Sequence, residues 1–142
     1  MIEKDLIIIH DLIDRYIAKH QEALSGEIKF PNLSNIQKRT LKWIEKQTHP
    51  VAEDLAFAFN KTFAEVNEAL HGLSGYGLVM LQPATNGQKT GPTIQLTPSG
   101  KKVVQVEEEA IMEFSSQVRS VLSEKELKEI DFLLSKVITR IG

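Results

Sequence analysis

The chain has 142 residues, a formal net charge of −2, 42% hydrophobic and 25% charged residues, an ordinary composition for one globular domain with its own core. No apolar run approaches the roughly 18 residues of a membrane span and no signal peptide is evident, so we expect a cytoplasmic protein that does not enter membranes. The sequence contains no cysteine, which excludes disulfides and thiol redox sensing.

Apolar residues recur at helical spacing over residues 2–24, and Ser25 and Gly26 end this first predicted helix. Ile7 and Ile8 widen its apolar stripe beyond one face. A helix with so broad a stripe needs more than one partner. We therefore expect it to contact the core together with either a neighbouring helix or a second subunit.

Ser34 and Gln37 have the spacing of a capping box, which predicts that the second helix starts there. It ends near residues 48–50, and a short helix follows over residues 51–59. The inward positions of the second helix are Ile36, Leu41 and Ile44.

Thr62 and Glu65 repeat the capping-box spacing after a turn at residues 60–61, and Gly77 is a natural left-handed stop for the helix that they open. The positions that this helix buries are Val66, Ala69, Leu70 and Leu73. A short helix, a turn and a second helix form a helix-turn-helix, whose second helix enters the major groove of DNA.

Short strands are predicted over residues 78–81 and 93–96. The loop between them is rich in turn-forming residues, with Asn86-Gly87 as the turn signal. This hairpin is the wing of a winged helix-turn-helix. The predicted fold class is therefore mostly α (α+β), a helix-turn-helix with a small β-hairpin.

Thr97 as N-cap and Pro98 in the first turn open a long helix that runs to about Ser120. Ser123 and Glu126 have capping-box spacing and open the last helix. Apolar residues recur along both helices at Val103, Val106, Ala110, Ile111, Phe114, Val118, Val121, Leu127, Ile130, Leu133, Leu134, Val137, Ile138 and Ile141. We predict a single domain over residues 1–142, with a winged lobe at 34–97 and dimerisation helices at 1–24 and 98–142.

Charge is distributed unevenly along the chain. Residues 27–104 hold nine basic and six acidic residues, whereas the flanks hold eight basic and thirteen acidic residues. A mildly basic middle between acidic ends suits a DNA-facing lobe and a separate assembly lobe. The same pattern also arises in proteins without a nucleic-acid role.

Several short motifs occur in an order that resembles the MarR family of transcriptional regulators. These motifs are Leu55-Ala56, Leu73, Gly77-Leu78-Val79, Leu96-Thr97-Pro98-Ser99-Gly100 and Leu122-Ser123-Glu124-Lys125-Glu126-Leu127. The resemblance covers nearly the whole chain. It implies a two-fold homodimer paired by the terminal helices, which binds double-stranded DNA at specific sequences. It also implies a repressor that is released by a small-molecule effector.

Two departures from the family pattern bear on function. The outward positions of the second motif helix, Ala64, Asn67, Glu68 and His71, include no basic residue. The wing usually holds an aspartate followed by arginine, but residues 86–91 hold neither, and Leu81 stands where a basic residue is common. Because phosphate neutralisation supplies much of DNA affinity, the alternative is a winged-helix dimer that acts as a protein-interaction or scaffold module.

The candidate DNA-binding residues lie before, along and after the second motif helix. Glu65 either caps the helix or reads cytosine, and Glu68 either reads a base, repels wrong partners or is solvated. Lys89 at the wing tip is the best candidate for a minor-groove or phosphate contact. The full set is Arg39, Lys61, Thr62, Ala64, Asn67, Glu68, His71, Gln88, Lys89 and Thr90.

No motif indicates catalysis, a cofactor or a metal site. The four histidines, His10, His20, His49 and His71, form no pair at helical spacing. Trp43 lies outside the main apolar positions of its helix and either packs under a neighbour or stacks on a ligand. We predict that the protein is not an enzyme.

Overall fold

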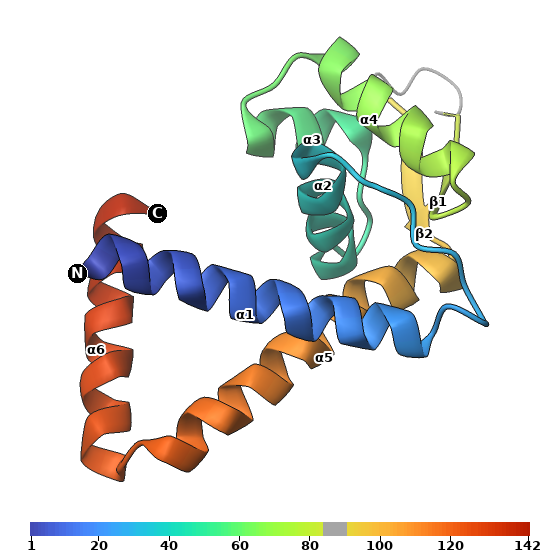
Figure 1. Cartoon of the computed structure of the whole chain (residues 1–142). Helices are drawn as coiled ribbons and strands as arrows, with labels where there is room; N and C mark the ends of the chain where they lie inside the picture. The colour runs from blue at the N-terminus through green and yellow to red at the C-terminus, as the bar shows by residue number, and fades with distance from the viewer. Residues whose placement is uncertain (84–90) are drawn as a thin grey trace. The chain divides into compact units, whose positions relative to one another are not determined.

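The computed structural model describes residues 1–83 and 91–142. These residues form six helices and one two-stranded antiparallel sheet (Figure 1). In chain order the elements are α1 (Ile2–Ala23), α2 (Asn35–Lys46), α3 (Ala52–Phe59), α4 (Phe63–Gly75), β1 (Val79–Gln82), β2 (Thr93–Leu96), α5 (Pro98–Val121) and α6 (Glu124–Ile141). The predicted fold class, a mostly helical winged helix-turn-helix, is confirmed.

The chain divides into two compact units. One comprises residues 1–20 and 108–142, and the other comprises residues 21–107. We call them the terminal-helix unit and the winged unit. The boundaries between them fall inside α1 and α5.

Apolar side chains from every element of the winged unit form its core. α2 and α4 approach closely, because a Cβ added at Gly72 would lie 2.5 Å from Nε2 of Gln37. Trp43 packs against this core, as the packing interpretation predicted. The buried cluster consists of Leu33, Leu41, Ile44, Ala52, Leu55, Val66, Leu70, Leu73, Leu78, Val79, Ile94, Leu96 and Val104.

The three predicted capping boxes are confirmed. Each hydroxyl accepts the backbone N–H three residues later, and the side chain of that residue accepts the backbone N–H of the cap. The pairs are Ser34 with Gln37, Thr62 with Glu65, and Ser123 with Glu126. Asn60 closes α3 in the left-handed conformation at φ 51°, which aims the chain at the start of α4.

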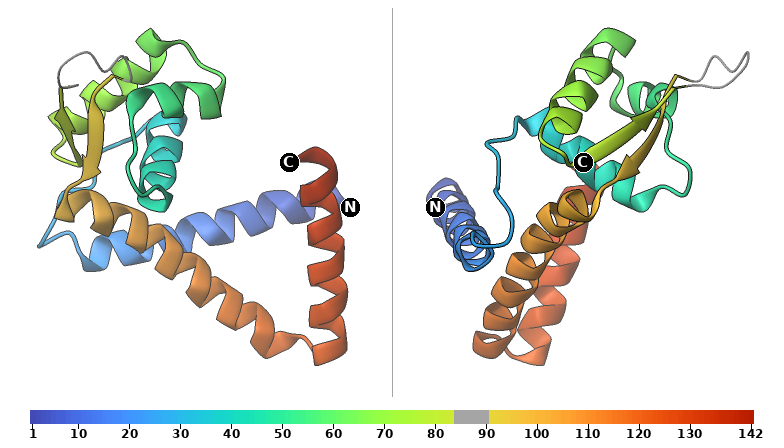
Figure 2. Two further views of the ribbon diagram at one scale, coloured as in Figure 1. Left: turned by 180° about the vertical axis from the view of Figure 1, so that it is seen from behind. Right: turned by 90° about the vertical axis from the view of Figure 1, so that its right-hand side faces the viewer.

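β1 and β2 pair side by side in register, with Val79 opposite Leu96 and Gln82 opposite Thr93 (Figure 2). A further antiparallel bridge joins Val51 to Thr93 and so ties the start of α3 to the hairpin. Gly77 adopts φ +74° between α4 and β1, the predicted left-handed stop. The predicted turn at Asn86-Gly87 lies outside the described residues.

α5 buries Val106 and Ala110, as predicted, but the rest of its buried set differs from the prediction. Val104 was absent from the prediction and is only 4% exposed, whereas Ile111 and Val121 were included and are 44% and 77% exposed. The first turns of α5 belong to the winged unit and pack on its core. From Glu108 onward the helix belongs to the terminal-helix unit, where Ala110 is still buried but Ile111 and Val121 are not.

In the terminal-helix unit, neither α1 nor α6 has a buried residue. Tyr16 and Phe114 meet edge to face with ring centroids 5.7 Å apart. Glu113 accepts hydrogen bonds from Lys19 at 3.0 Å and pairs with His20 at 2.5 Å, which connects α1 to α5. Over the described ranges, no helix is both long enough and apolar enough to cross a membrane.

Candidate nucleic-acid interface

Three of the six exposed residues of α4 form a narrow stripe, and the other three are Phe63, Glu65 and Gly75. Ala64, Glu68 and His71 are exposed at spacings of four and three residues, so they share one face of the helix. The opposite face is buried in the core of the winged unit. At a rise of about 1.5 Å per residue the stripe is about 10 Å long, which matches roughly three base steps of DNA. We call these three residues the reading stripe.

Asn67 does not belong to this stripe, although the sequence predicted it among the outward positions. Its side chain is half-buried. It follows the buried Val66 on α4, so it lies at the margin between the core face and the reading stripe. Its proposed contact with a base stays a prediction.

Thr62 and Glu65 fix the start of the helix that carries the reading stripe. The Glu65 backbone N–H donates to Oγ1 of Thr62 at 3.2 Å, and the Thr62 backbone N–H donates to Oε2 of Glu65 at 2.9 Å. The hydrogen bond from the Thr62 backbone holds the pKa of the Glu65 carboxyl below its usual value, and the nearby charge of Lys61 adds to this effect. The capping interpretation of Glu65 is therefore confirmed.

Removal of this cap has a defined expected cost. Thr62→Ala should lower the free energy of unfolding by about 1 kcal/mol, since the N–H of Glu65 loses its acceptor. Thr62→Ser keeps the hydroxyl, so its free energy of unfolding should stay close to that of the parent. Urea unfolding at neutral pH measures the stability of both variants, and equal stability of Thr62→Ala and the parent would contradict the role of the cap.

The Glu65 half of the cap should depend on pH. Since the pKa of Glu65 is lowered in the folded protein, its stabilisation is present above the ordinary value of 4.5 and is lost as the pH falls through the folded value. The free energy of unfolding of Glu65→Gln should therefore vary less with pH in this acidic range than that of the parent. Identical pH profiles of the two proteins would contradict this role of the Glu65 carboxylate.

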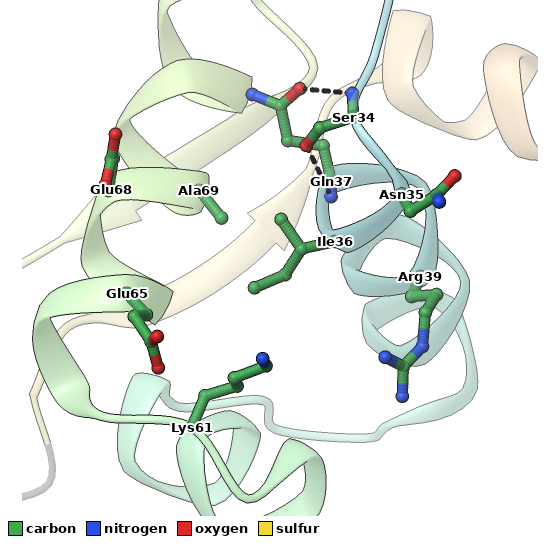
Figure 3. A pocket seen from close by; sticks show the side chains of 9 residues that line it. All are labelled: Ser34, Asn35, Ile36, Gln37, Arg39, Lys61, Glu65, Glu68 and Ala69. Carbon is green, nitrogen blue, oxygen red and sulfur yellow. Dashed lines mark hydrogen bonds between the residues drawn. The ribbon is translucent and has the colours of Figure 1, made fainter.

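A hollow of about 620 Å³ lies between α2 and α4. Glu65 and Glu68 border it from α4, Arg39 borders it from α2, and Lys61 lies between them (Figure 3). The remaining lining residues are Ser34, Asn35, Ile36, Gln37 and Ala69. This α2–α4 hollow thus joins the reading stripe to two cationic side chains.

Arg39 is held in place by an aromatic ring. Its guanidinium carbon lies 4.5 Å from the ring centroid of Phe59 on α3. The planar guanidinium suits a bidentate phosphate contact. Lys42, by contrast, forms an ion pair with Glu107, which the sequence did not predict. Part of the positive charge of α2 is therefore neutralised by another residue of the same chain.

The predicted contacts of the wing tip, Gln88, Lys89 and Thr90, lie outside the described residues. Within the described ranges, no group of three or more histidine or acidic side chains is placed to hold a metal ion.

Comparison with known proteins identifies the fold but no sequence family. No family model and no curated protein matches the sequence. The structure of S. aureus MepR in complex with DNA is similar at TM-score 0.68 and 22% identity, over 96% of each chain. S. aureus MepR bound to ethidium bromide matches at TM-score 0.69 and 21% identity, over 100% of this chain and 97% of that one. YusO from Bacillus subtilis matches at TM-score 0.70 and 14% identity, over 98% of this chain and 93% of that one.

These likenesses extend over nearly the full length of each chain. The chain therefore has the MarR-like winged helix-turn-helix fold that the sequence resemblance implied. MepR is described as a transcription regulator of the multidrug efflux pump MepA, so the fold is one that transcription regulators use.

Proposed function

We propose that this chain is a sequence-specific, DNA-binding transcriptional regulator that works as a homodimer. The observation that carries this proposal is the capped helix α4, which presents a continuous exposed stripe from a winged helix-turn-helix fold. A helix presented in this way suits insertion into the major groove, which is wide enough to admit it. The likeness to MepR in complex with DNA supports the same reading.

The terminal helices support the homodimer. α1 and α6 have 22 and 18 residues, and neither buries a single side chain within one chain. Ile7 and Ile138 are 70% and 66% exposed, and so large an apolar surface marks an interaction site. A second copy of the chain offers a matching surface with two-fold symmetry, and two reading stripes then face two half-sites.

We further propose that the regulator is a cytoplasmic repressor that leaves DNA when a small molecule binds. The likeness to MepR bound to ethidium bromide supports a small-molecule effector. The test is release of a selected duplex on titration of planar cationic dyes such as ethidium. Unchanged affinity across a panel of such compounds would remove this part of the proposal.

Binding to duplex DNA across a salt series tests the central proposal. The logarithm of the affinity should fall linearly with the logarithm of salt concentration, because each phosphate contact releases counterions. Lys89→Ala should reduce this slope by about 1 and weaken binding to most sequences alike. Lys128→Ala, on α6, is the control and should leave the slope unchanged. An unchanged slope in Lys89→Ala would show that the wing does not touch phosphate.

A second candidate function has one observation in its favour. The reading stripe carries no positive charge, which is unusual for a helix that faces phosphates. If the parent binds no duplex at low salt and selects no sequence, the winged-helix dimer is better interpreted as a protein-interaction or scaffold module.

A further inference from the structure

We propose that Glu68 selects a C·G base pair near the centre of each half-site by accepting a hydrogen bond from the exocyclic amine of cytosine. This inference deepens the proposed function and rests on it. It names the residue that sets one position of the operator and the base that the residue takes.

The geometry of α4 leaves Glu68 as the carboxylate available for this role. Glu65 is engaged by the backbone of Thr62 and is therefore committed to the helix cap. Glu68 is exposed in the middle of the reading stripe, between Ala64 and His71. Over residues 1–83 and 91–142, its carboxylate forms no hydrogen bond or ion pair.

The chemistry of a carboxylate narrows the choice of base. An ionised glutamate only accepts hydrogen bonds, so it needs a donor on the base edge. In the major groove, guanine presents two acceptors and thymine presents an acceptor and a methyl group, whereas cytosine and adenine each present an amine donor. Adenine places its N7 acceptor beside that donor and so repels a carboxylate, but cytosine has no such acceptor. Cytosine is the base that fits.

The surrounding charge explains why the carboxylate sharpens selection. A carboxylate near phosphates is repelled on any sequence, and only a correctly placed donor offsets that repulsion. Lys61 and Arg39 border the same α2–α4 hollow and supply the positive charge for the DNA backbone close to Glu68 (Figure 3). Glu68 thus penalises wrong sequences, while the flanking cations hold the duplex.

Selection from randomised duplexes with the full-length chain tests the proposal through two substitutions. Glu68→Gln should move the preference at this position from cytosine to adenine, because an amide pairs with both the N6 and the N7 of adenine. Glu68→Ala should make the position indifferent. Glu45→Gln is the control, since it removes one charge from the last turns of α2, whereas the hollow lies at the first turns of that helix.

Affinities for defined duplexes supply the second measurement. For the parent, replacing the selected C·G pair should weaken binding about 5- to 150-fold, and Glu68→Ala should reduce this ratio to near one. Glu68→Gln should also bind random duplex about 2- to 10-fold more tightly than the parent, since a repulsive charge is gone. If Glu68 is merely solvated, its substitution can change the affinity for all duplexes alike but leaves the ratio for the C·G pair unchanged.

The possible outcomes distinguish failure of the Glu68 inference from failure of the proposed regulator function. If the parent selects an operator and Glu68→Gln selects the same one, Glu68 is not the reader, although the regulator proposal stands. If Glu45→Gln changes the selected base as much as Glu68→Gln does, the effect is one of general charge and the inference is wrong. A parent that selects nothing overturns the proposed function and this inference with it.

Discussion

Gly100→Ala should destabilise the folded chain by about 3 kcal/mol or more, the upper end of what overpacking usually costs. A Cβ at this position would lie 2.1 Å from the carbonyl oxygen of Leu78. That oxygen also accepts the backbone N–H of Thr97 at 3.1 Å, and the Leu78 N–H donates to the carbonyl oxygen of Leu73 at 3.0 Å, so Leu78 is held by hydrogen bonds on both sides. Because the obstacle is backbone and not a flexible side chain, rotamer changes cannot relieve the clash.

The substitution should lower the stability of the whole fold as well as disturb local packing. Gly100 lies in the first turn of α5, where its N–H donates to Oγ1 of Thr97 and α5 meets the hairpin. A loss of this size is a large fraction of the 5–15 kcal/mol by which domains are stable. Urea unfolding followed by circular dichroism should show a much lower midpoint with a similar slope.

Gly75→Ala is the matched control on α4. A Cβ at Gly75 meets nothing within 4 Å, and the residue is the last of the helix. This substitution should be neutral or should stabilise the helix by up to about 1 kcal/mol, because alanine is the better helix former. If the two variants unfold at the same urea concentration, the close approach of Gly100 to Leu78 does not control stability.

The secondary structure was predictable because local signals decide it. The hydroxyl and the glutamate or glutamine of each capping box, such as Thr62 and Glu65, are three residues apart, so their hydrogen bonds follow from the sequence alone. The hairpin began one residue later than predicted, at Val79, since Leu78 is still bound to the end of α4 through Leu73. Boundaries of this kind depend on tertiary contacts.

Burial was less predictable where two units share one helix. The apolar period of α5 is continuous, so the sequence gives no sign that Val104 is covered and Val121 is exposed. That difference depends on which elements pack against each half of the helix. The same limit applies to the proposed site: the pairing of Lys42 with Glu107 and the stacking of Arg39 on Phe59 join residues from different helices. No spacing rule along the chain reports such contacts.

The proposed DNA contacts, too, were predictable from the sequence only in part. The sequence identified the exposed stripe of α4 through its period, and Ala64, Glu68 and His71 are indeed exposed. It misplaced Asn67, which is half-buried at the edge of that stripe. A period of 3.6 residues locates the centre of a helix face well and its margins poorly, because the margins depend on the neighbouring helices.

A single charge in the apolar face of α6, near the C-terminal end of the helix, should dissociate the proposed homodimer. The parent should sediment at about twice the chain mass of 16.0 kDa at micromolar concentration, because the apolar faces of α1 and α6 need cover that one chain does not provide. Ile138→Glu should sediment at the mass of one chain, since burying an unpaired carboxylate in an apolar interface costs several kcal/mol. The variant should also bind its operator far more weakly, because each monomer then engages one half-site instead of two.

Thr139→Glu is the matched control for this experiment. Thr139 is exposed on the same helix, one position further along and about 100° around its axis, and the substitution adds the same charge. It should remain a dimer and keep its affinity for DNA. If both variants dissociate, α6 is sensitive to charge in general and its apolar stripe is not the interface. If the parent itself sediments as a monomer, the two half-sites lose their geometric basis, and binding through a single winged unit becomes the arrangement to test.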